Sequence, residues 1–374
     1  MFSHFRRALP LLLLLLLLLT ACQPSAPVDA TEGTEPEPTD APTEPAPEPR
    51  PNPLTGLQMA DDYELQRPVA IMINNIEEAT PPKGLSRFDA AFEVLAEGTI
   101  NRIIAVFYDY GKLGEVGSVR SARDYYFKLV RPLEPIICHY GGSPAAFIYI
   151  KNNRLDNLNG IDGSVDRLLY WRDPDRMKHG YEHSVFTSGE KLTATVAELG
   201  RSTELSKPER RYFTFRETVS PAGPLEAGRI TVPFSNYITA KFEYDATAEH
   251  YLRSQFGKPH IDANDGSQIA VDNLFVLFAP HKNVPGDADG RIEVGVVGSG
   301  SGFYFSRGKG VAINWSKAGD TEFFTLTKED GEPLAVNAGN MWFCIVKPTA
   351  KVAYEPAPAA ETPEAEAANH ADAD

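Results

Sequence analysis

The sequence predicts an α+β protein, with an N-terminal mixed α/β domain followed by a mostly β C-terminal domain. Between residues 54 and 222, apolar runs typical of buried strands alternate with segments that carry helix-start signals. Between residues 225 and 350, short β-branched and aromatic runs are separated by turn dipeptides such as Asp265-Gly266 and Asp289-Gly290. The region is long enough for two domains with cores of their own.

An export leader precedes the folded region. Two arginines near the start are followed by nine consecutive leucines, residues 11–19. This run is too short to span a bilayer, which takes about 20 apolar residues. Residues 19–22 (Leu-Thr-Ala-Cys) resemble the bacterial lipobox, in which the cysteine is lipidated and the leader is cut just before it. We therefore expect residues 1–22 to be a lipoprotein signal peptide, and Cys22 to anchor the chain to the extracytoplasmic face of the cell membrane.

Two segments have the composition of disordered chain. Residues 23–53 contain ten prolines and seven acidic residues, and residues 355–374 contain six acidic residues and neither lysine nor arginine. Such segments bury too little apolar surface to offset their chain entropy. We expect an extended Pro/Glu-rich spacer after Cys22 and a disordered acidic tail at the other end. The spacer and the tail together carry much of the net charge of −15, so the folded region is only mildly acidic. Nucleic acid is therefore not an expected partner, because its binding needs a basic surface.

Four apolar runs predict the strands of the first domain. They are residues 68–74, 89–97, 100–108 and 135–140. The second and third runs flank Gly98 and are expected to form a hairpin.

Three helices of this domain have start signals. The signals are Ser121 with Asp124, Pro144 after Gly141-Gly142-Ser143, and Thr187 with Glu190. We expect the first helix to end at Pro132 and the third to end near Gly200.

Seven runs predict the strands of the second domain. They are residues 229–234, 240–244, 269–278, 291–297, 303–305, 311–315 and 341–346. The glycines and serines of residues 298–302 lack the Lys-Ser/Thr of a phosphate-binding loop and are expected to form a turn. The aromatic run 303–305, Trp315 and Trp342 fit a β core, with a sugar-stacking platform as the alternative.

The remaining cysteines, Cys138 and Cys344, lie in apolar, strand-like runs without metal-ligand spacing. We expect two buried thiols rather than a disulfide.

Six segments carry a resemblance to a known family. They are residues 67–75, 93–98, 117–125, 139–144, His183 with 186–188, and 259–262. In this combination they resemble the YerB-like lipoproteins of mostly Gram-positive bacteria, over nearly all of residues 54–350. The resemblance implies a lipoprotein with two adjoining domains of unknown function. Ala96 stands where family members often have Val or Pro.

Glu93 and Glu97 are four residues apart, so they share a face on a regular strand and on a helix alike. Arg102 lies across the Gly98 turn and is expected to face them. One interpretation is an acid/base pair or a cation site. The other is a salt-bridged outer face of a hairpin.

Residues 117–124 place Arg120 and Arg123 at a predicted helix start, where backbone N–H groups favour anions. Guanidinium groups bind carboxylate or phosphate oxygens in pairs. One interpretation is an anion clamp. The other is a buried ion pair of one arginine with Asp124 or a glutamate.

Residues 139–144 (His-Tyr-Gly-Gly-Ser-Pro) lie where a buried strand is expected to end and a helix to begin, the usual ligand position in open α/β sheets. Gly141 and Gly142 allow a ligand to approach the backbone closely. Ser143 fits a helix N-cap better than a nucleophile activated by His139, because the nucleophile-elbow pattern is not met.

His179 and His183 fit the His-x-x-Glu-His spelling of a zinc motif, which needs a helix. Gly180 and the upstream Pro174 disfavour that helix, so no metal is expected, and His183 fits a hydrogen-bonded site or core residue. In the second domain, His260 and Asp262 alternate on a strand-like segment and are expected to share a face.

We expect Glu93, Arg120, Arg123, His139, Gly142 and His183 to converge on one cleft of the first domain. The full set of candidate ligand-binding residues is Arg102, Arg120, Arg123, Asp124, His139, Gly141, Gly142, Ser143 and His183. No cofactor is expected.

The sequence favours a lipid-anchored protein that binds an envelope component, either an anionic glycan or a membrane-bound cell-wall synthesis enzyme. The alternative is an envelope hydrolase or transferase that uses Glu93 or Glu97 with His139 or His183. A solute-binding lipoprotein is disfavoured, because the second domain reads as β. The catalytic alternative requires one of the two carboxylates within hydrogen-bond reach of one of the two histidines.

Overall fold

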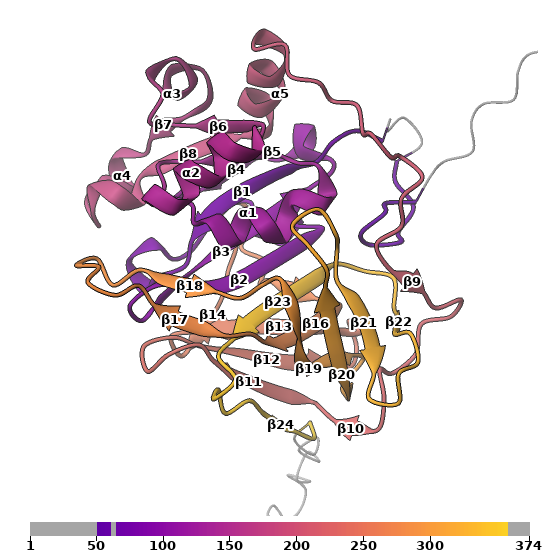
Figure 1. The fold of residues 1–374 in the computed structure, drawn as a ribbon. Coiled ribbons are helices and arrows are strands. Elements are labelled where there is room, and N and C mark those ends of the chain that lie inside the picture. Colours follow the sequence, from indigo (N-terminus) through magenta and orange to yellow (C-terminus); the bar gives the residue numbers. More distant parts are fainter. Residues whose placement is uncertain (1–50, 61–64, 358–374) are drawn as a thin grey trace, which may run out of the picture. The chain divides into compact units, whose positions relative to one another are not determined.

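The computed structural model of the protein describes residues 51–60 and 65–357 (Figure 1). The predicted leader, Cys22, most of the spacer and most of the acidic tail lie outside the described residues. The described residues all belong to one compact unit. Within the described ranges, no helix has the length and apolar character needed to cross a membrane. We refer to described residues up to 222 as the N-terminal half and to those from 225 as the C-terminal half.

The largest sheet has eleven strands and draws on both halves. Its strands are, in spatial order, β10 (Leu225–Glu226), β20 (Lys309–Lys317), β19 (Gly298–Ser306), β16 (Asn273–Phe278), β23 (Met341–Val346), β2 (Ala90–Glu97), β3 (Ile100–Phe107), β1 (Val69–Asn74), β5 (Ile136–His139) and β6 (Asn157–Asn159), with β21 (Thr325–Lys328) paired to β20.

The two halves meet where β2 runs parallel to β23. Phe92 lies opposite Phe343, and Phe343 lies opposite Phe275 on β16. The three rings stack, with centroid distances of 4.7 Å and 4.5 Å. The sheet therefore continues across the junction, and one hydrophobic core includes residues of both halves. The domain boundary between residues 222 and 225 stays a prediction.

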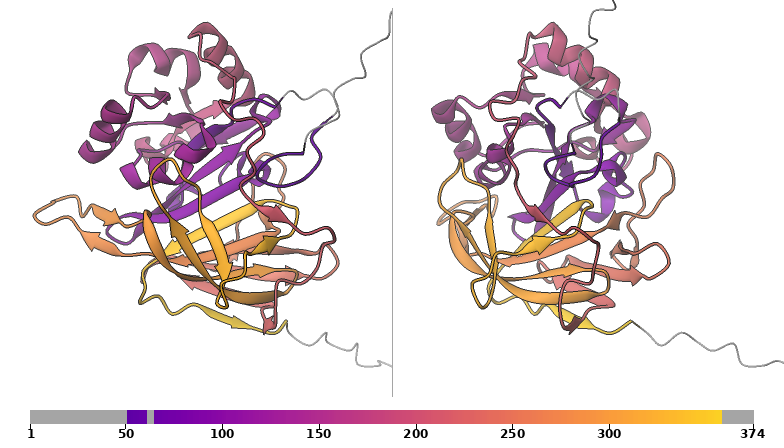
Figure 2. Two further views of the ribbon diagram at one scale, coloured as in Figure 1. Left: turned by 45° about the vertical axis from the view of Figure 1, so that its right-hand side comes forward. Right: turned by 90° about the vertical axis from the view of Figure 1, so that its right-hand side faces the viewer.

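The N-terminal half carries the helices, which gather at the end of the molecule away from the six-stranded sheet described below (Figure 2). They are α1 (Asp124–Val130), α2 (Pro144–Asn153), α3 (Gly163–Leu169), α4 (Pro174–Met177) and α5 (Gly189–Glu198). A small sheet joins β4 (Glu115–Gly117), β8 (Val185–Ser188) and β7 (Trp171–Arg172) in that order. Short 3-10 turns span Glu77–Ala79, Leu85–Arg87, Tyr110–Lys112, Arg131–Leu133 and Tyr181–His183.

The C-terminal half adds a six-stranded antiparallel sheet. Its strands are β14 (Lys258–Pro259), β13 (His250–Gln255), β12 (Thr239–Asp245), β11 (Arg229–Pro233) and β24 (Ala353–Glu355), with β15 (Ala270–Val271) paired to β13. A hairpin of β17 (His281–Asn283) and β18 (Ile292–Val294) projects beside the N-terminal half (Figure 1). The last pair is β9 (Thr214–Phe215) with β22 (Ala335–Val336).

The fold class and the main predicted strands are confirmed. The prediction for α2 is also confirmed, because the Ser143 hydroxyl accepts a hydrogen bond from the Ala146 amide at 3.1 Å. Trp315 and Trp342 are buried, as expected for a β core, and Cys138 and Cys344 are buried free thiols. Strand β13 was not predicted, because two of its three buried positions hold Arg253 and Gln255 instead of apolar residues.

Two predicted helix starts are wrong. Helix α1 begins at Asp124, and the Ser121 hydroxyl donates to the Tyr140 carbonyl at 2.9 Å instead of capping the helix. Helix α5 is capped by Ser188, while the Thr187 hydroxyl donates to the Leu169 carbonyl. In both places a serine or threonine hydroxyl bonds a distant carbonyl, which local sequence patterns do not reveal.

The turn expected at residues 298–302 is also wrong, since these residues begin strand β19. A Cβ atom on Gly300 would lie 2.6 Å from the Phe278 carbonyl and 2.7 Å from Trp315 Nε1. The glycine is there for close packing inside the sheet rather than for a turn.

Candidate functional site

The two carboxylates of β2 point to opposite faces of the sheet. The register of β2 against β3 shifts between Leu95 and Glu97, which makes Ala96 an extra, unpaired residue. Such a bulge reverses the alternation of side chains beyond it. Glu93 therefore bonds Asn101, whereas Glu97 bonds its neighbour Arg102 on the other face. The expected carboxylate pair does not form.

The bulge is held by helix α1. The Tyr125 hydroxyl donates to the Leu95 carbonyl at 2.6 Å and lies 3.3 Å from the Ala96 carbonyl. The neighbouring Tyr126 hydroxyl donates to the Val94 carbonyl at 2.6 Å. Buried carbonyls that the irregular ladder leaves free thus find partners, which stabilises the bulge.

Glu93 lies in the interior between the two halves and is 0% exposed. Its carboxylate accepts hydrogen bonds from four donors: Asn75 Nδ2 at 2.8 Å, Asn101 Nδ2 at 2.5 Å, Arg253 Nη2 at 2.8 Å and Trp342 Nε1 at 3.0 Å. A buried carboxylate that accepts four hydrogen bonds, one of them from a guanidinium group, is a structural ion-pair partner.

Arg253 is the residue of this interior cluster that the sequence did not reveal. Its guanidinium contacts Glu93, Gln255 Oε1 and His260 Nδ1, and lies 4.9 Å from the centre of the Trp342 ring. Burial and the charge of Arg253 hold the pKa of His260 well below its ordinary value. His260 therefore stays neutral.

Asp262 was expected on the same face as His260, but it binds a different segment. Its carboxylate accepts from the Gly84 amide at 3.0 Å and the Ser86 amide at 2.8 Å. It therefore fastens a loop of the N-terminal half to the C-terminal half.

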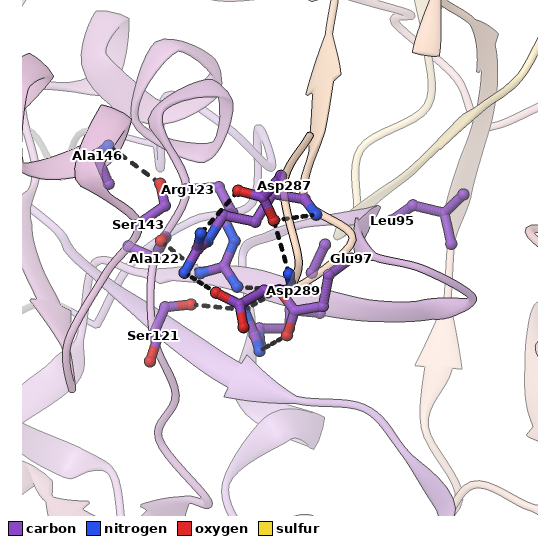
Figure 3. Close-up of polar contacts among 12 residues, drawn as sticks. Leu95, Glu97, Ser121, Ala122, Arg123, Ser143, Ala146, Asp287 and Asp289 are labelled. Atoms are coloured by element: carbon purple, nitrogen blue, oxygen red, sulfur yellow. Dashed lines mark hydrogen bonds and ion pairs between the residues drawn. The ribbon is translucent and has the colours of Figure 1, made fainter. Parts of the chain in front are cut away.

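On the opposite face of the sheet, Glu97 lies between two guanidinium groups. Arg102 Nη2 donates to Glu97 Oε1 at 2.5 Å, and Arg123 Nη2 contacts Glu97 Oε2 (Figure 3). The side chains of Arg102 and Arg123 are 2% and 8% exposed, and that of Glu97 is 20% exposed. Burial lowers the pKa of both arginines without removing their charge.

The two predicted arginine and glycine motifs lie side by side. The Tyr140 amide donates to the Arg120 carbonyl at 3.1 Å, and the Ala122 amide donates to the Gly141 carbonyl at 3.0 Å. Gly141 has a φ of +79°, and a Cβ atom there would lie 3.0 Å from Ile161 and 3.1 Å from the Ser121 hydroxyl. Glycine is required at this position, which brings the end of β5 against the arginine segment.

Arg120 is half-buried beside this segment. Its Nη1 atom donates to the Glu182 carbonyl at 3.1 Å. Burial, together with the positive charges of Arg102 and Arg172, lowers the pKa of Arg120 to about 10. Arg120 thus lies near both of these arginines, and still carries its charge at neutral pH.

Arg172, which the sequence did not reveal as part of the site, packs against two tyrosine rings. Its guanidinium carbon lies 3.6 Å from the centre of the Tyr181 ring and 5.2 Å from that of the Tyr140 ring. Tyr181 is 62% exposed. We call Arg102, Arg120, Arg123 and Arg172 the arginine row.

The hairpin β17–β18 borders the row. The Gly98 amide donates to the Gly290 carbonyl at 2.9 Å, which holds the hairpin against the end of β2. Its loop carries Asp287 and Asp289, both paired with Arg291 (Figure 3). The charge of Arg291 lowers the pKa of Arg123, and the charge of Asp287 raises it. The C-terminal half thus supplies one edge of the site.

The candidate histidines have structural partners. His139 Nδ1 lies 2.8 Å from the Gly141 carbonyl, and His183 Nδ1 lies 2.9 Å from Asn74 Nδ2. Burial lowers the pKa of both. Across the described residues, no hydrogen bond joins Glu93 or Glu97 to either histidine, so the geometry required for the catalytic alternative is not met.

The expected convergence is therefore partial. Arg120, Arg123, Gly141, Gly142 and Ser143 come together, with Arg102 and Glu97. Glu93 lies on the other face because of the bulge, His139 points into the core, and Asp124 pairs with Lys128 at 2.7 Å rather than with an arginine. Among the described residues, no group of three His, Cys, Asp or Glu side chains is placed to hold a metal ion.

Three cavities, of about 560, 340 and 330 Å³, are lined by other residues. The largest lies at the opposite end of β1 and β5, between Arg67, Arg131, Asp156 and Arg210. The arginine row does not line any of these three cavities.

The comparisons with known proteins agree with this architecture. Residues 54–202 match the N-terminal domain, and residues 230–343 the C-terminal domain, of a protein of unknown function (DUF3048). A relative from Bacillus subtilis (strain 168), named "Putative lipoprotein YerB", is 32% identical over 299 residues, which cover 79% of this chain and 85% of the relative.

A solved structure gives the same result. The crystal structure of YerB protein from Bacillus subtilis matches with a TM-score of 0.70 and 28% identity, over 81% of this chain and 99% of that chain. The resemblance seen in the sequence motifs is thereby confirmed. The chain, which matches both DUF3048 domains, belongs to the YerB-like lipoprotein family.

Proposed function

We propose that the protein is a lipid-anchored binding protein of the cell envelope, and that its arginine row holds an anionic envelope glycan. Lipidation of Cys22 would place the folded region on the extracytoplasmic face of the membrane, at the end of the Pro/Glu-rich spacer. The relative named a lipoprotein supports membrane anchoring. The observation that carries the proposal is the excess of positive charge in the arginine row.

The excess follows from the pairing of the four guanidinium groups. Glu97 pairs with both Arg102 and Arg123. Among the described contacts, Arg120 donates only to the Glu182 carbonyl, and Arg172 only to the Tyr181 carbonyl and the Ser184 hydroxyl. Four positive charges therefore face the paired carboxylate of Glu97 and the exposed side chain of Glu182, while Asp287 and Asp289 at the border of the row are paired with Arg291. Concentrated positive charge on a mildly acidic protein attracts anions.

The hydrogen-bonding capacity of the row is also incompletely used. The Nε atoms of Arg102, Arg120 and Arg123 are buried and have no hydrogen-bond partner among the described residues. A guanidinium group binds phosphate or carboxylate oxygens through two parallel N–H donors. These unused donors lie on three of the four arginines of the row, so the row has hydrogen-bonding capacity left for anionic oxygens.

The exposed Tyr181 ring suits the sugar part of such a ligand. The guanidinium carbon of Arg172 lies 3.6 Å from the centre of this ring. Tyr181 is nevertheless 62% exposed to solvent. An aromatic ring offers an apolar face together with a polar hydroxyl. A glycan with charged substituents would place sugar rings at Tyr181 and its anionic groups along the row.

The proposal is tested with the full chain in detergent and a purified wall glycan that carries phosphate groups. We expect Arg120→Ala to weaken binding at least tenfold, because the arginine row loses one positive charge. No carboxylate loses its partner in this variant. Arg229→Ala is the matched control, since Arg229 is an exposed arginine of β11. The same glycan without its phosphates should bind neither the wild type nor the two variants.

Equal binding by the wild type and Arg120→Ala would contradict the proposal. Capture of a membrane-bound cell-wall enzyme through the same arginine, without glycan binding, would contradict the glycan assignment in favour of a protein partner.

A further inference from the structure

We infer that Glu97 occupies the place of the ligand's anionic group in the arginine row, and that a phosphoryl group displaces it from Arg102 and Arg123. This inference rests on the proposed function and identifies the group that the row binds. Glu97 is then an internal competitor that sets the affinity of the site.

The first argument is how the two arginines are held. Arg102 Nη1 donates to the Ser121 carbonyl at 3.2 Å, and Arg123 Nη1 donates to the Ala122 carbonyl at 2.8 Å. These consecutive carbonyls hold both guanidinium groups in addition to Glu97. The arginines therefore have anchors that do not depend on the carboxylate.

The second argument is how Glu97 is held. Among the described residues, its carboxylate bonds only the two guanidinium groups of Arg102 and Arg123. It is also the most exposed member of the three, with 20% of its side chain accessible. Departure of the carboxylate would break contacts with the arginines alone among the described residues, and would free donors on two guanidinium groups that backbone carbonyls still hold.

The third argument is the position of Glu97 in the chain. It is the last residue of β2, it follows the bulge at Ala96, and it precedes Gly98, which has a φ of +51°. The backbone is fixed by the Gly98 amide, which donates to the Gly290 carbonyl. Displacement therefore needs only rotation about the side-chain bonds of Glu97, which is partly exposed.

The ligand class follows from the donors that displacement exposes. Arg102 and Arg123 each offer a guanidinium edge to oxygen, and Arg120 lies close enough to Arg102 for their charges to interact. A carboxylate has two oxygens, whereas a phosphoryl group offers up to three strong acceptors and a larger negative charge. Two arginines at the position of Glu97, with the charge of Arg120 acting on Arg102, therefore favour a phosphoryl group over a second carboxylate.

The test uses the full chain in detergent with inorganic polyphosphate as the probe, and titration calorimetry as the measurement. We expect Glu97→Gln to raise the affinity at least tenfold, because the competing carboxylate is gone. Glu182→Gln is the matched control. It removes an equal charge near Arg120 without uncovering a guanidinium group, so we expect a gain of threefold or less.

Two additional variants keep the test independent of folding. Glu97→Asp retains the charge but is too short to reach both arginines, so we expect an intermediate affinity. In the double variant with Glu97→Gln and Arg123→Ala, the gain should disappear. Thermal unfolding of each protein, with and without polyphosphate, should show a larger stabilisation by polyphosphate in Glu97→Gln than in the wild type.

Three outcomes would overturn the inference. Equal gains in Glu97→Gln and Glu182→Gln would mean that general electrostatics alone governs binding. Weaker binding by a folded Glu97→Gln would mean that Glu97 positions the arginines. An equal gain for polyglutamate would contradict the phosphoryl assignment. The proposed function is tested separately. It fails if the wild type and Arg120→Ala bind the wall glycan equally, whatever the result for Glu97→Gln.

Discussion

Glu93 and Arg253 form a fully buried ion pair, 2.8 Å long, between residues 160 positions apart in the chain. Glu93 comes from β2 in the N-terminal half, and Arg253 from β13 in the C-terminal half. The pair fastens the six-stranded sheet to the junction of the large sheet. A buried charge without its partner is costly, so this pair makes the packing of the two halves specific.

Arg253→Met should destabilise the protein by about 3–5 kcal/mol, because the Glu93 carboxylate would remain buried without its cation. Adding Glu93→Gln to that variant should restore part of the loss. Urea unfolding of the single and double variants measures the coupling, with Arg229→Met as the exposed control. Equal stability of the wild type and Arg253→Met would show that the pair does not hold the halves together.

His260 should make the protein less stable in mild acid. Its pKa in the folded state is held well below the ordinary 6.5 by burial and by Arg253, so its contribution is full above about pH 6.5. The contribution is lost as the pH falls below that value, because the unfolded chain then binds a proton that the folded chain excludes. The expected slope is at most about 1.4 kcal/mol per pH unit.

Asp89 changes the pH dependence of stability in the opposite direction. The contribution of His260 must therefore be measured as a difference between the wild type and a His260 variant. Burial raises the pKa of Asp89 from 3.8 to about 7, despite the hydrogen bonds from Tyr108 and Asn52 that lower it. Its contribution to stability falls as the pH rises between these two values. The free energy of unfolding should therefore be measured from pH 7.5 to 5 for the wild type and His260→Gln. A difference that does not change with pH would contradict the prediction.

Arg123→Ala and Arg120→Ala should differ in stability. Arg123 is buried and pairs with Glu97, but the carboxylate keeps Arg102 and some contact with water, so we expect a loss of about 1–3 kcal/mol. Arg120 gives up a single hydrogen bond to a carbonyl, and we expect a loss of about 1 kcal/mol or less. Thermal and urea unfolding of the two variants, measured side by side, check the order; a reversed order would refute the assignment of Arg123 as the buried partner.

Cys22→Ala should release the protein from the membrane or leave the leader uncleaved, because the predicted lipid anchor is attached at that cysteine. The measurement is the distribution of the chain between membrane and soluble fractions. Cys138→Ala is the control, since Cys138 is a buried thiol. Continued membrane attachment of Cys22→Ala with a cleaved leader would contradict anchoring through this residue.

The main strands could be read from the sequence because each is a local apolar run bounded by turn residues. The start of α2 was equally readable, since Ser143 and Pro144 supply the cap and the first turn within two positions. The proximity of the arginine and glycine motifs followed from the rule that ligand positions lie where buried strands end. The strands and the start of α2 depend on residues that are near each other in the chain.

The composition of the site could not be read in the same way. The bulge at Ala96 decides that Glu97, and not Glu93, faces Arg102 and Arg123. Its position depends on the register of β2 and on the hydroxyl of Tyr125, which no pattern in residues 93–97 reveals.

The sequence by itself determined the predicted lipid anchor, the order of strands and helices along the chain, and the residue types from which the site is made. Only the tertiary structure decided which charges meet. Arg253 becomes the partner of Glu93, and Arg172 joins the site, through contacts between distant segments. The energy of a buried charge depends on the groups packed around it, and packing brings those groups from any part of the chain.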